Sequence, residues 1–451
     1  MRKVVLAGVL AVACSNFAVA QCTERVSASQ KGSLLFYSKV ELRWNAAGAL
    51  VQDTVLSLLN DYPADVNVQM YFINGDAELD PVFSSGPAPI LIAEGEPGWN
   101  WVDCALLLTP DQPVYWSAAT GNPIGCQPFA ILDPDLGNGP GRPDPEGSTD
   151  RVLRGYVIAY AIDASGNEVC WDHLSGKATI INYAETSAWE YNAWAFQSVV
   201  CDVNGAHPDP GTLRMDGNEY QNSFDMLLFD FFASGSQAFS GGGTIVTVDT
   251  DLTLHLLDGD FRENSEFPYN PPTTKAHFDI WNMNERKLSN TRRCITCWDQ
   301  TLISNYGAPN NMLLANMQSD KGKARIDGKQ ADECEENCLR TVTGDLMELE
   351  DIIDLLGDLF GQVDIICSID ASLLGVAAKH LTFSGGAVAT AGSNLVGMGC
   401  QSATIRTDLI DPPGTLREDA YNRIGRDATK VNSSVRPSDR LQSAPTTKSS
   451  N

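Results

Sequence analysis

The chain has 451 residues and is strongly acidic, with 57 Asp and Glu against 31 Lys and Arg and a formal charge of −26. A field of this sign repels a phosphate backbone, so nucleic acid is excluded as a partner, and solubility or cation binding is the expected consequence. The length corresponds to two domains of ordinary size with additional terminal segments.

The first twenty residues have the order of a secretory signal peptide. Arg2 and Lys3 precede an apolar run over 4–14, and Ala18-Val19-Ala20 offers small residues for cleavage. A lipoprotein anchor at Cys14 or Cys22 is disfavoured by the flanking residues, and no later segment is long and apolar enough to span a membrane. We therefore predict a signal peptide at 1–20, an N-terminal segment at 21–30, and a secreted or cell-surface protein, extracellular or periplasmic.

Residues 32–76 predict three strands joined by short turns. Alternation over 34–44 and again over 66–73 indicates extended chain, and the segments 45–48 and 74–76 carry turn residues. An element with one apolar face needs a second sheet to cover it, which predicts a β-sandwich. Strict alternation places Leu35, Tyr37, Lys39, Glu41 and Arg43 on one face, and Leu34, Phe36, Val40, Leu42 and Trp44 with Ser38 on the other.

A long polar loop covers residues 133–150. Asp133, Asp135 and Asn138 suggest a calcium loop, although the glycine of an EF-hand would fall one place earlier and no Glu follows at the right distance. A solvated loop is the alternative. Calcium is the cofactor that this loop suggests.

Strand character returns over 155–162 and 176–182, and aromatic residues follow closely. Trp189 and Trp194 would stack on sugar rings if they were exposed at a sandwich edge, whereas burial in a core or an interface is the commoner role of such residues.

The chain contains twelve cysteines, and eleven remain after cleavage at residue 20. Export favours disulfides, and the odd number leaves at least one thiol free or paired between chains, with Cys22 as the candidate. Proximity in the sequence predicts two bonds. These are Cys104 with Cys126, and Cys170 with Cys201.

A second group of cysteines forms two close pairs. Cys294 and Cys297 are followed by Cys334 and Cys338, a spacing from which four thiolates can converge on a structural zinc ion. An oxidising compartment favours disulfides instead.

The second half of the chain repeats features of the first. Leu227–Phe229 matches Leu34–Phe36, and Asp249-Thr250 matches Asp53-Thr54. The later matches pair 278–282 with 71–74 and Gly322–Ile326 with Gly176–Ile180. Two diverged copies of one domain would give this order, and chance similarity between short strands is the alternative. We predict a first β-sandwich domain at 31–205, a linker or turn at 206–224 and a second at 225–415.

One segment interrupts the β pattern. Apolar residues recur at helical spacing over 345–360, opposite a face that carries only acidic charges, so we expect a helical insertion in the second domain. The polar residues 416–451 lack an apolar period and predict a disordered tail.

Several strings resemble those of uncharacterised secreted bacterial proteins. They are LLFYSKVELRW with YFINGD, and RGYVIAYAIDASG with LSGKATIIN. The resemblance implies immunoglobulin-like or jelly-roll sandwich domains on or outside the cell, and it carries over no catalytic residue.

No catalytic signature is present. The five histidines have no HxxxH or HxH spacing, and the sequence contains neither a Gly-x-Ser-x-Gly elbow nor a phosphate loop. We therefore expect a non-catalytic extracellular protein with a structural or binding role, whose partner is a surface polysaccharide or a matrix protein. The alternative is a glycan-binding or carbohydrate-active protein that uses Trp189 and Trp194.

Overall fold

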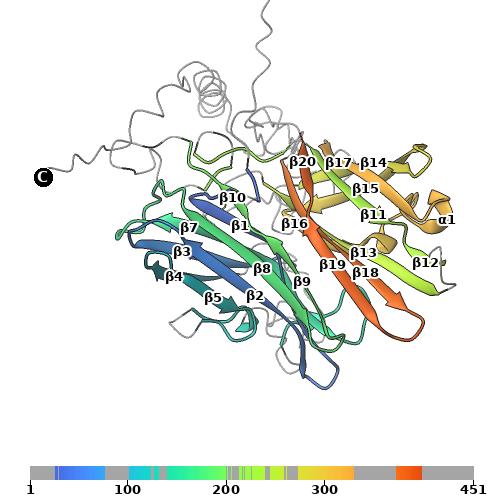
Figure 1. Ribbon diagram of the computed structural model, residues 1–451, viewed down its shortest axis with the longest axis horizontal. Coiled ribbons are helices and arrows are strands. Elements are labelled where there is room, and N and C mark those ends of the chain that lie inside the picture. The colour runs from blue at the N-terminus through green and yellow to red at the C-terminus, as the bar shows by residue number, and fades with distance from the viewer. Residues whose placement is uncertain are drawn as a thin grey trace, which may run out of the picture.

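The computed structural model describes the following residues: 26–28, 30–76, 101–122, 126–131, 140–199, 201, 205, 213–215, 217, 219–224, 226–238, 244–257, 261, 273–329 and 372–398. The fold of this part is mainly β, with several antiparallel sheets, as the sequence predicted (Figure 1). Several predictions concern residues outside it: the signal peptide, Cys22, the calcium candidates Asp133, Asp135 and Asn138, Cys334 and Cys338, the helical insertion, and the tail.

The N-terminal half forms one sheet of ten strands, whose central path runs β4-β3-β7-β1-β2-β8-β9. Its first three strands are the three predicted in residues 32–76. The strands are β1 (Leu34–Trp44), β2 (Leu50–Asn60), β3 (Val66–Asn74), β4 (Trp101–Leu108), β5 (Pro113–Ser117), β6 (Arg142–Pro143), β7 (Arg151–Ile162), β8 (Leu174–Asn182), β9 (Ser187–Asn192) and β10 (Trp194–Phe196).

The C-terminal half forms two sheets of five strands. One contains β11 (Met226–Phe232), β14 (Thr273–Asn282), β15 (Lys287–Thr296), β17 (Lys321–Lys329) and β20 (Val396–Met398). The other contains β12 (Gly235–Ala238), β13 (Ile245–Leu256), β16 (Trp298–Leu302), β18 (Leu373–Phe383) and β19 (Val388–Asn394). Three short helices complete the described elements: η1 (Phe129–Ile131), η2 (Ile303–Asn305) and α1 (Leu314–Met317).

The strand pairings of the two halves follow one order. The path β4-β3-β7-β1 has its counterpart in β15-β14-β17-β11, and β2-β8-β9 has its counterpart in β13-β18-β19. Likewise β10 pairs with β1 as β20 pairs with β11, and β5 pairs with β2 as β16 pairs with β13. The sequence match of 322–326 with 176–180 disagrees with this order, because β17 takes the place of β7, and β18 takes that of β8.

Two buried clusters fill the interior. One lies mainly in the N-terminal half, where it holds Leu35, Phe72 and Trp116 among others, and it also includes Val376 and Ala378 of β18. The other joins the two halves, since it combines Phe36 and Tyr156 with much of the C-terminal half. Both faces of β1 and β7 are therefore covered, which explains why nearly every residue of these strands is buried.

Part of the predicted linker at 206–224 belongs to this shared core. Leu213, Met215 and Tyr220 are buried in the cluster that joins the halves. These three side chains thus pack in the core between the halves, together with apolar side chains from both of them.

The edges of two sheets also meet. β9 and β19 lie side by side, so that β2, β8, β9, β19 and β18 form a row across both halves (Figure 1). The side chain of Asn394 in β19 bonds to the backbone of Asn192 in β9. Its Oδ1 accepts from the Asn192 amide at 3.2 Å, and its Nδ2 donates to the Asn192 carbonyl at 2.9 Å. Each edge strand thereby covers the other, which shields both from pairing with further chains.

Two disulfides lie in the N-terminal half. Cys104 is joined to Cys126 and Cys170 to Cys201, with Cα–Cα distances of 5.3 and 6.1 Å, in the pairing that the sequence order predicted. Cys294 is also disulfide-bonded, and Cys297 is buried.

Candidate functional site

A β-bulge in β1 organises the polar interior between the halves. Tyr37 pairs with Val157 and Val40 with Gly155, so Ser38 and Lys39 together face one residue of β7. A bulge of this kind reverses the alternation of the strand. Residues 35 and 37 before it, and 40 and 42 after it, therefore point into the same core, and the predicted faces of β1 are wrong beyond Tyr37.

Three side chains from other strands satisfy the backbone of the bulge. The hydroxyl of Tyr191 in β9 accepts from the Lys39 amide at 2.7 Å and donates to the Lys39 carbonyl. From the C-terminal half, Trp298 Nε1 donates to the Ser38 carbonyl at 2.9 Å, and His255 Nε2 lies 3.1 Å from the same oxygen. The bulge thus bonds to both halves.

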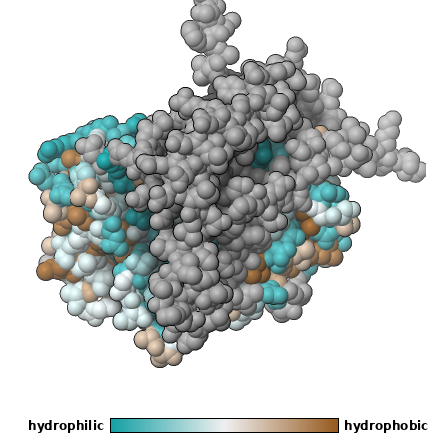
Figure 2. Space-filling model, turned by 180° about the vertical axis from the view of Figure 1, so that it is seen from behind, coloured by the Kyte–Doolittle hydropathy of each residue, from teal (hydrophilic) through white to brown (hydrophobic). Residues whose placement is uncertain are grey.

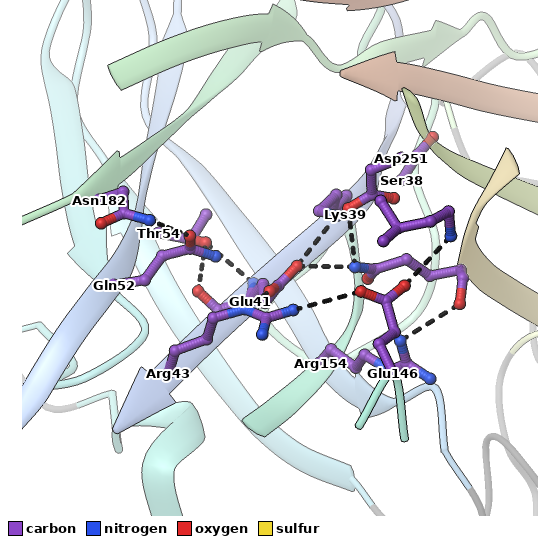
Figure 3. Close-up of polar contacts among 12 residues, drawn as sticks. Ser38, Lys39, Glu41, Arg43, Gln52, Thr54, Glu146, Arg154, Asn182 and Asp251 are labelled. Atoms are coloured by element: carbon purple, nitrogen blue, oxygen red, sulfur yellow. Dashed lines mark hydrogen bonds and ion pairs between the residues drawn. The ribbon is translucent and has the colours of Figure 1, made fainter. Parts of the chain in front are cut away.

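After the bulge, the charged side chains of β1 lie among polar side chains from other parts of the chain, with Lys39 beside Asp251 (Figure 3). The Lys39 ammonium bonds to Asp251 of β13 and lies 2.9 Å from Glu41 Oε2. Gln300 of β16 joins the two carboxylates, since its Nε2 donates to Glu41 Oε2 at 2.8 Å and to Asp251 Oδ2 at 3.0 Å. All four side chains are buried.

The polar loop before β7 extends this cluster. Arg43 bonds to Glu41 and donates to Asp144 Oδ2 at 2.7 Å, while the Leu302 amide donates to Glu146 Oε1 at 3.1 Å. Asp144 is buried, so the solvated alternative for the loop 133–150 does not hold at this residue.

A further ion pair closes the cluster on the side of β7. Arg154 binds both carboxylate oxygens of Asp76, at 2.8 and 3.0 Å, and donates to the Gln300 carbonyl at 3.2 Å. Its guanidinium also lies over the ring of Trp298, 5.7 Å from the centroid. We call this set the interface network. Its members are Lys39, Glu41, Arg43, Asp76, Asp144, Glu146, Arg154, Asp251 and Gln300.

The network holds more acidic than basic groups, and their pKa values diverge. Burial would raise the pKa of Glu41, but Arg43 and Lys39 hold it well below its usual range. Burial, together with the charges of Asp251 and Glu41, raises the pKa of Glu146 to about 7. Glu146 is therefore partly protonated near neutral pH.

His255 is the buried aromatic partner of the bulge. Its ring makes edge contacts with Phe36 and Tyr156, each at 4.5 Å between centroids, and burial lowers its pKa to about 3. The imidazole is thus neutral at physiological pH and donates to the Ser38 carbonyl as a fixed hydrogen-bonding group.

The arrangement is suited to holding strands together. The ionised side chains contact oppositely charged side chains inside the protein, and the pair of Lys39 with Asp251 connects β1 to β13. Hydrogen bonds of Gln300 with Glu41 and Arg154 connect β16 to β1 and β7. Within the residues described by the structure, no group of three or more His, Cys, Asp or Glu side chains is arranged to hold a metal ion.

The predicted sugar-stacking residues are buried instead of exposed. Trp189 retains 9% of its surface and Trp194 4%. Trp189 covers Gly392 of β19, and Trp194 packs against Phe224 at 5.5 Å between ring centroids. Both tryptophans therefore contact the C-terminal half, and neither forms a platform for a ligand.

Sequence reasoning missed the interface network. The charged positions 39, 41 and 43 were interpreted only as one face of an alternating strand, and the partners of Lys39 and Glu41 in the C-terminal half come more than two hundred residues later. The signal in the sequence was the density of apolar residues on both sides of these charges, which marks a strand buried on both faces.

No protein-family model matches the chain, and no curated protein matches it. Among the helices that the structure describes, none has the length and apolar character needed to cross a bilayer. On the face seen in Figure 2, hydrophilic and hydrophobic residues of the described part are interspersed.

Proposed function

We propose that this protein is a secreted or cell-surface, non-catalytic protein with an extracellular structural or binding role. It consists of two copies of one β-sandwich domain that are held together as a single rigid unit. The observation that carries the proposal is the interface network, in which the buried Lys39 of one half pairs with Asp251 of the other, and Glu41 accepts from Gln300. Such a junction fixes geometry between domains and leaves the outer surfaces for contacts.

The common pairing order of the halves supports the duplication. A local feature agrees with it: Asp53 Oδ1 accepts from the Thr54 amide at 2.8 Å, and Asp249 Oδ1 accepts from the Thr250 amide at 2.8 Å. Burial raises the pKa of both aspartates. Equivalent positions in β2 and β13 thus share residue types, hydrogen bonds and environment.

The extracellular location rests on the signal-peptide pattern and the disulfides. The bonds Cys104–Cys126 and Cys170–Cys201 need an oxidising compartment in most organisms. The test is expression of the full chain in a secreting bacterium, followed by mass spectrometry of the exported fraction. We expect a chain that begins at Gln21 with both bonds oxidised. A chain found in the cytoplasm with residues 1–20 and reduced thiols would overturn the proposal.

A second candidate function, glycan binding, has a separate observation in its favour. It is an exposed aromatic cluster at one end of the N-terminal half, away from Trp189 and Trp194.

A further inference from the structure

Three aromatic rings gather where two loops meet at one end of the first sheet. Asn60 pairs with Leu174, so the loop 61–65 after β2 and the segment 169–173 before β8 emerge together. Tyr62 lies 5.0 Å from Trp171 and 4.4 Å from His173, between ring centroids. Tyr62 is 40% exposed, and Trp171 and His173 are partly exposed.

The structure holds these rings in place. The buried amide of Asn60 accepts from Trp171 Nε1 at 3.0 Å and from the Tyr62 amide at 3.1 Å, and it donates to the Ala64 carbonyl at 2.8 Å. The disulfide of Cys170 is adjacent to Trp171 in the chain. Rings fixed before binding lose little conformational entropy when a ligand stacks on them.

Polar groups surround the rings at hydrogen-bonding positions. His173 Nδ1 lies 3.2 Å from Asp61 Oδ1, and the Lys31 ammonium bonds to the other oxygen of the same carboxylate. These side chains are partly exposed and have donors and acceptors beyond those used with one another. Apolar ring faces beside a few oriented polar groups are the features of a small-molecule or sugar subsite.

We propose that Tyr62, Trp171 and His173 form a binding site for a neutral polysaccharide chain. Sugar rings present apolar C–H faces to aromatic rings, and their hydroxyls bond to carboxylate, imidazole and ammonium groups. The formal charge of −26 disfavours anionic glycans, which selects neutral chains. The site lies on loops at the end of a sandwich, where binding residues commonly occur on this type of scaffold. This inference deepens the proposed extracellular binding role and rests on it.

The experiment is affinity electrophoresis of the full mature chain through gels that contain neutral glucans, xylan or mannan, with polygalacturonate as the anionic comparison. Tyr62→Ala is compared with Tyr183→Ala, because Tyr183 is 50% exposed and follows the opposite end of β8. We expect retardation by at least one neutral polysaccharide. Tyr62→Ala should weaken it about five- to tenfold, and Tyr183→Ala should leave it unchanged. His173→Ala is the second variant, and thermal unfolding of each variant confirms folding.

Two results would overturn the site. One is the absence of retardation of the wild-type chain by every neutral polysaccharide, and the other is equal loss in Tyr62→Ala and Tyr183→Ala. Export and disulfide oxidation are measured separately. A chain that is exported and oxidised but binds no polysaccharide therefore overturns this site and leaves the extracellular role standing.

Discussion

At the scale of single residues, Glu146 is the member of the interface network whose protonation changes near neutral pH. Its carboxyl has two like charges nearby, Asp251 and Glu41, and burial removes water that would stabilise its ionised form. The raised pKa means that the folded state holds a proton that the unfolded state has released above about pH 4.5. The contribution of Glu146 to stability should therefore fall as the pH rises from about 4.5 to about 7, with no further change from this group above that.

Glu146→Gln should remove this loss. The amide oxygen can still accept from the Leu302 amide, but no charge forms. Relative to wild type, we expect almost no change in the free energy of unfolding at pH 4 and a gain of about 2–3 kcal/mol at pH 8. Urea denaturation at both pH values is the measurement. The exposed Glu190→Gln serves as the control, and an equal effect of the two variants would contradict the prediction.

Whereas ionised Glu146 destabilises the folded state, Lys39 stabilises it, because its ammonium neutralises two buried carboxylates. Lys39→Met would leave Glu41 and Asp251 without their shared cation, and the expected loss is about 3–5 kcal/mol. The matched control is Lys177→Met, which breaks the exposed pair with Glu190 and should leave the free energy of unfolding almost unchanged. Chemical denaturation of both variants at pH 7 would reveal the difference, and similar losses would mean that burial adds nothing to the Lys39 pairs.

At the scale of elements, the seam between β9 and β19 depends on a glycine. A Cβ at Gly392 would lie 1.9 Å from the ring of Trp189, so the two strands would have to separate. We expect Gly392→Ala to cost about 1–3 kcal/mol, as overpacking of an interior does. Gly385→Ala is the control, because a Cβ there meets open space. Thermal unfolding of the two variants is the measurement, and equal midpoints would show that the seam tolerates displacement.

Individual strands could be predicted from the sequence, and their partners could not. Alternation predicted the strands at 34–44 and 66–74 within a residue, because period is a local property, and the strand at 50–60 was expected between them without bounds. The bulge at Ser38 and Lys39 leaves no local mark, so the faces were assigned wrongly after it. The apposition of Asp251 and Lys39, or of Tyr62 and Trp171, depends on tertiary packing that no short window contains.

At the scale of the whole molecule, the halves should unfold together. Both buried clusters contain residues of both halves, and the interface network adds the pair of Lys39 with Asp251, which neither half can form alone. We expect one cooperative transition in calorimetry, with equal calorimetric and van't Hoff enthalpies, and loss of that equality in Lys39→Met. Two separate transitions in the wild-type chain would show that the halves are thermodynamically independent.

The bulge in β1 also implies an asymmetry in which residues evolution can change. The group that His255 and Trp298 recognise is the carbonyl of residue 38, which belongs to the main chain and is supplied by any amino acid. The Ser38 hydroxyl has no partner among the described residues, so alanine should serve as well there. His255 and Trp298 donate from side chains and have no such freedom. Across related sequences, variation should therefore accumulate at the accepting position and be rare at the two donors.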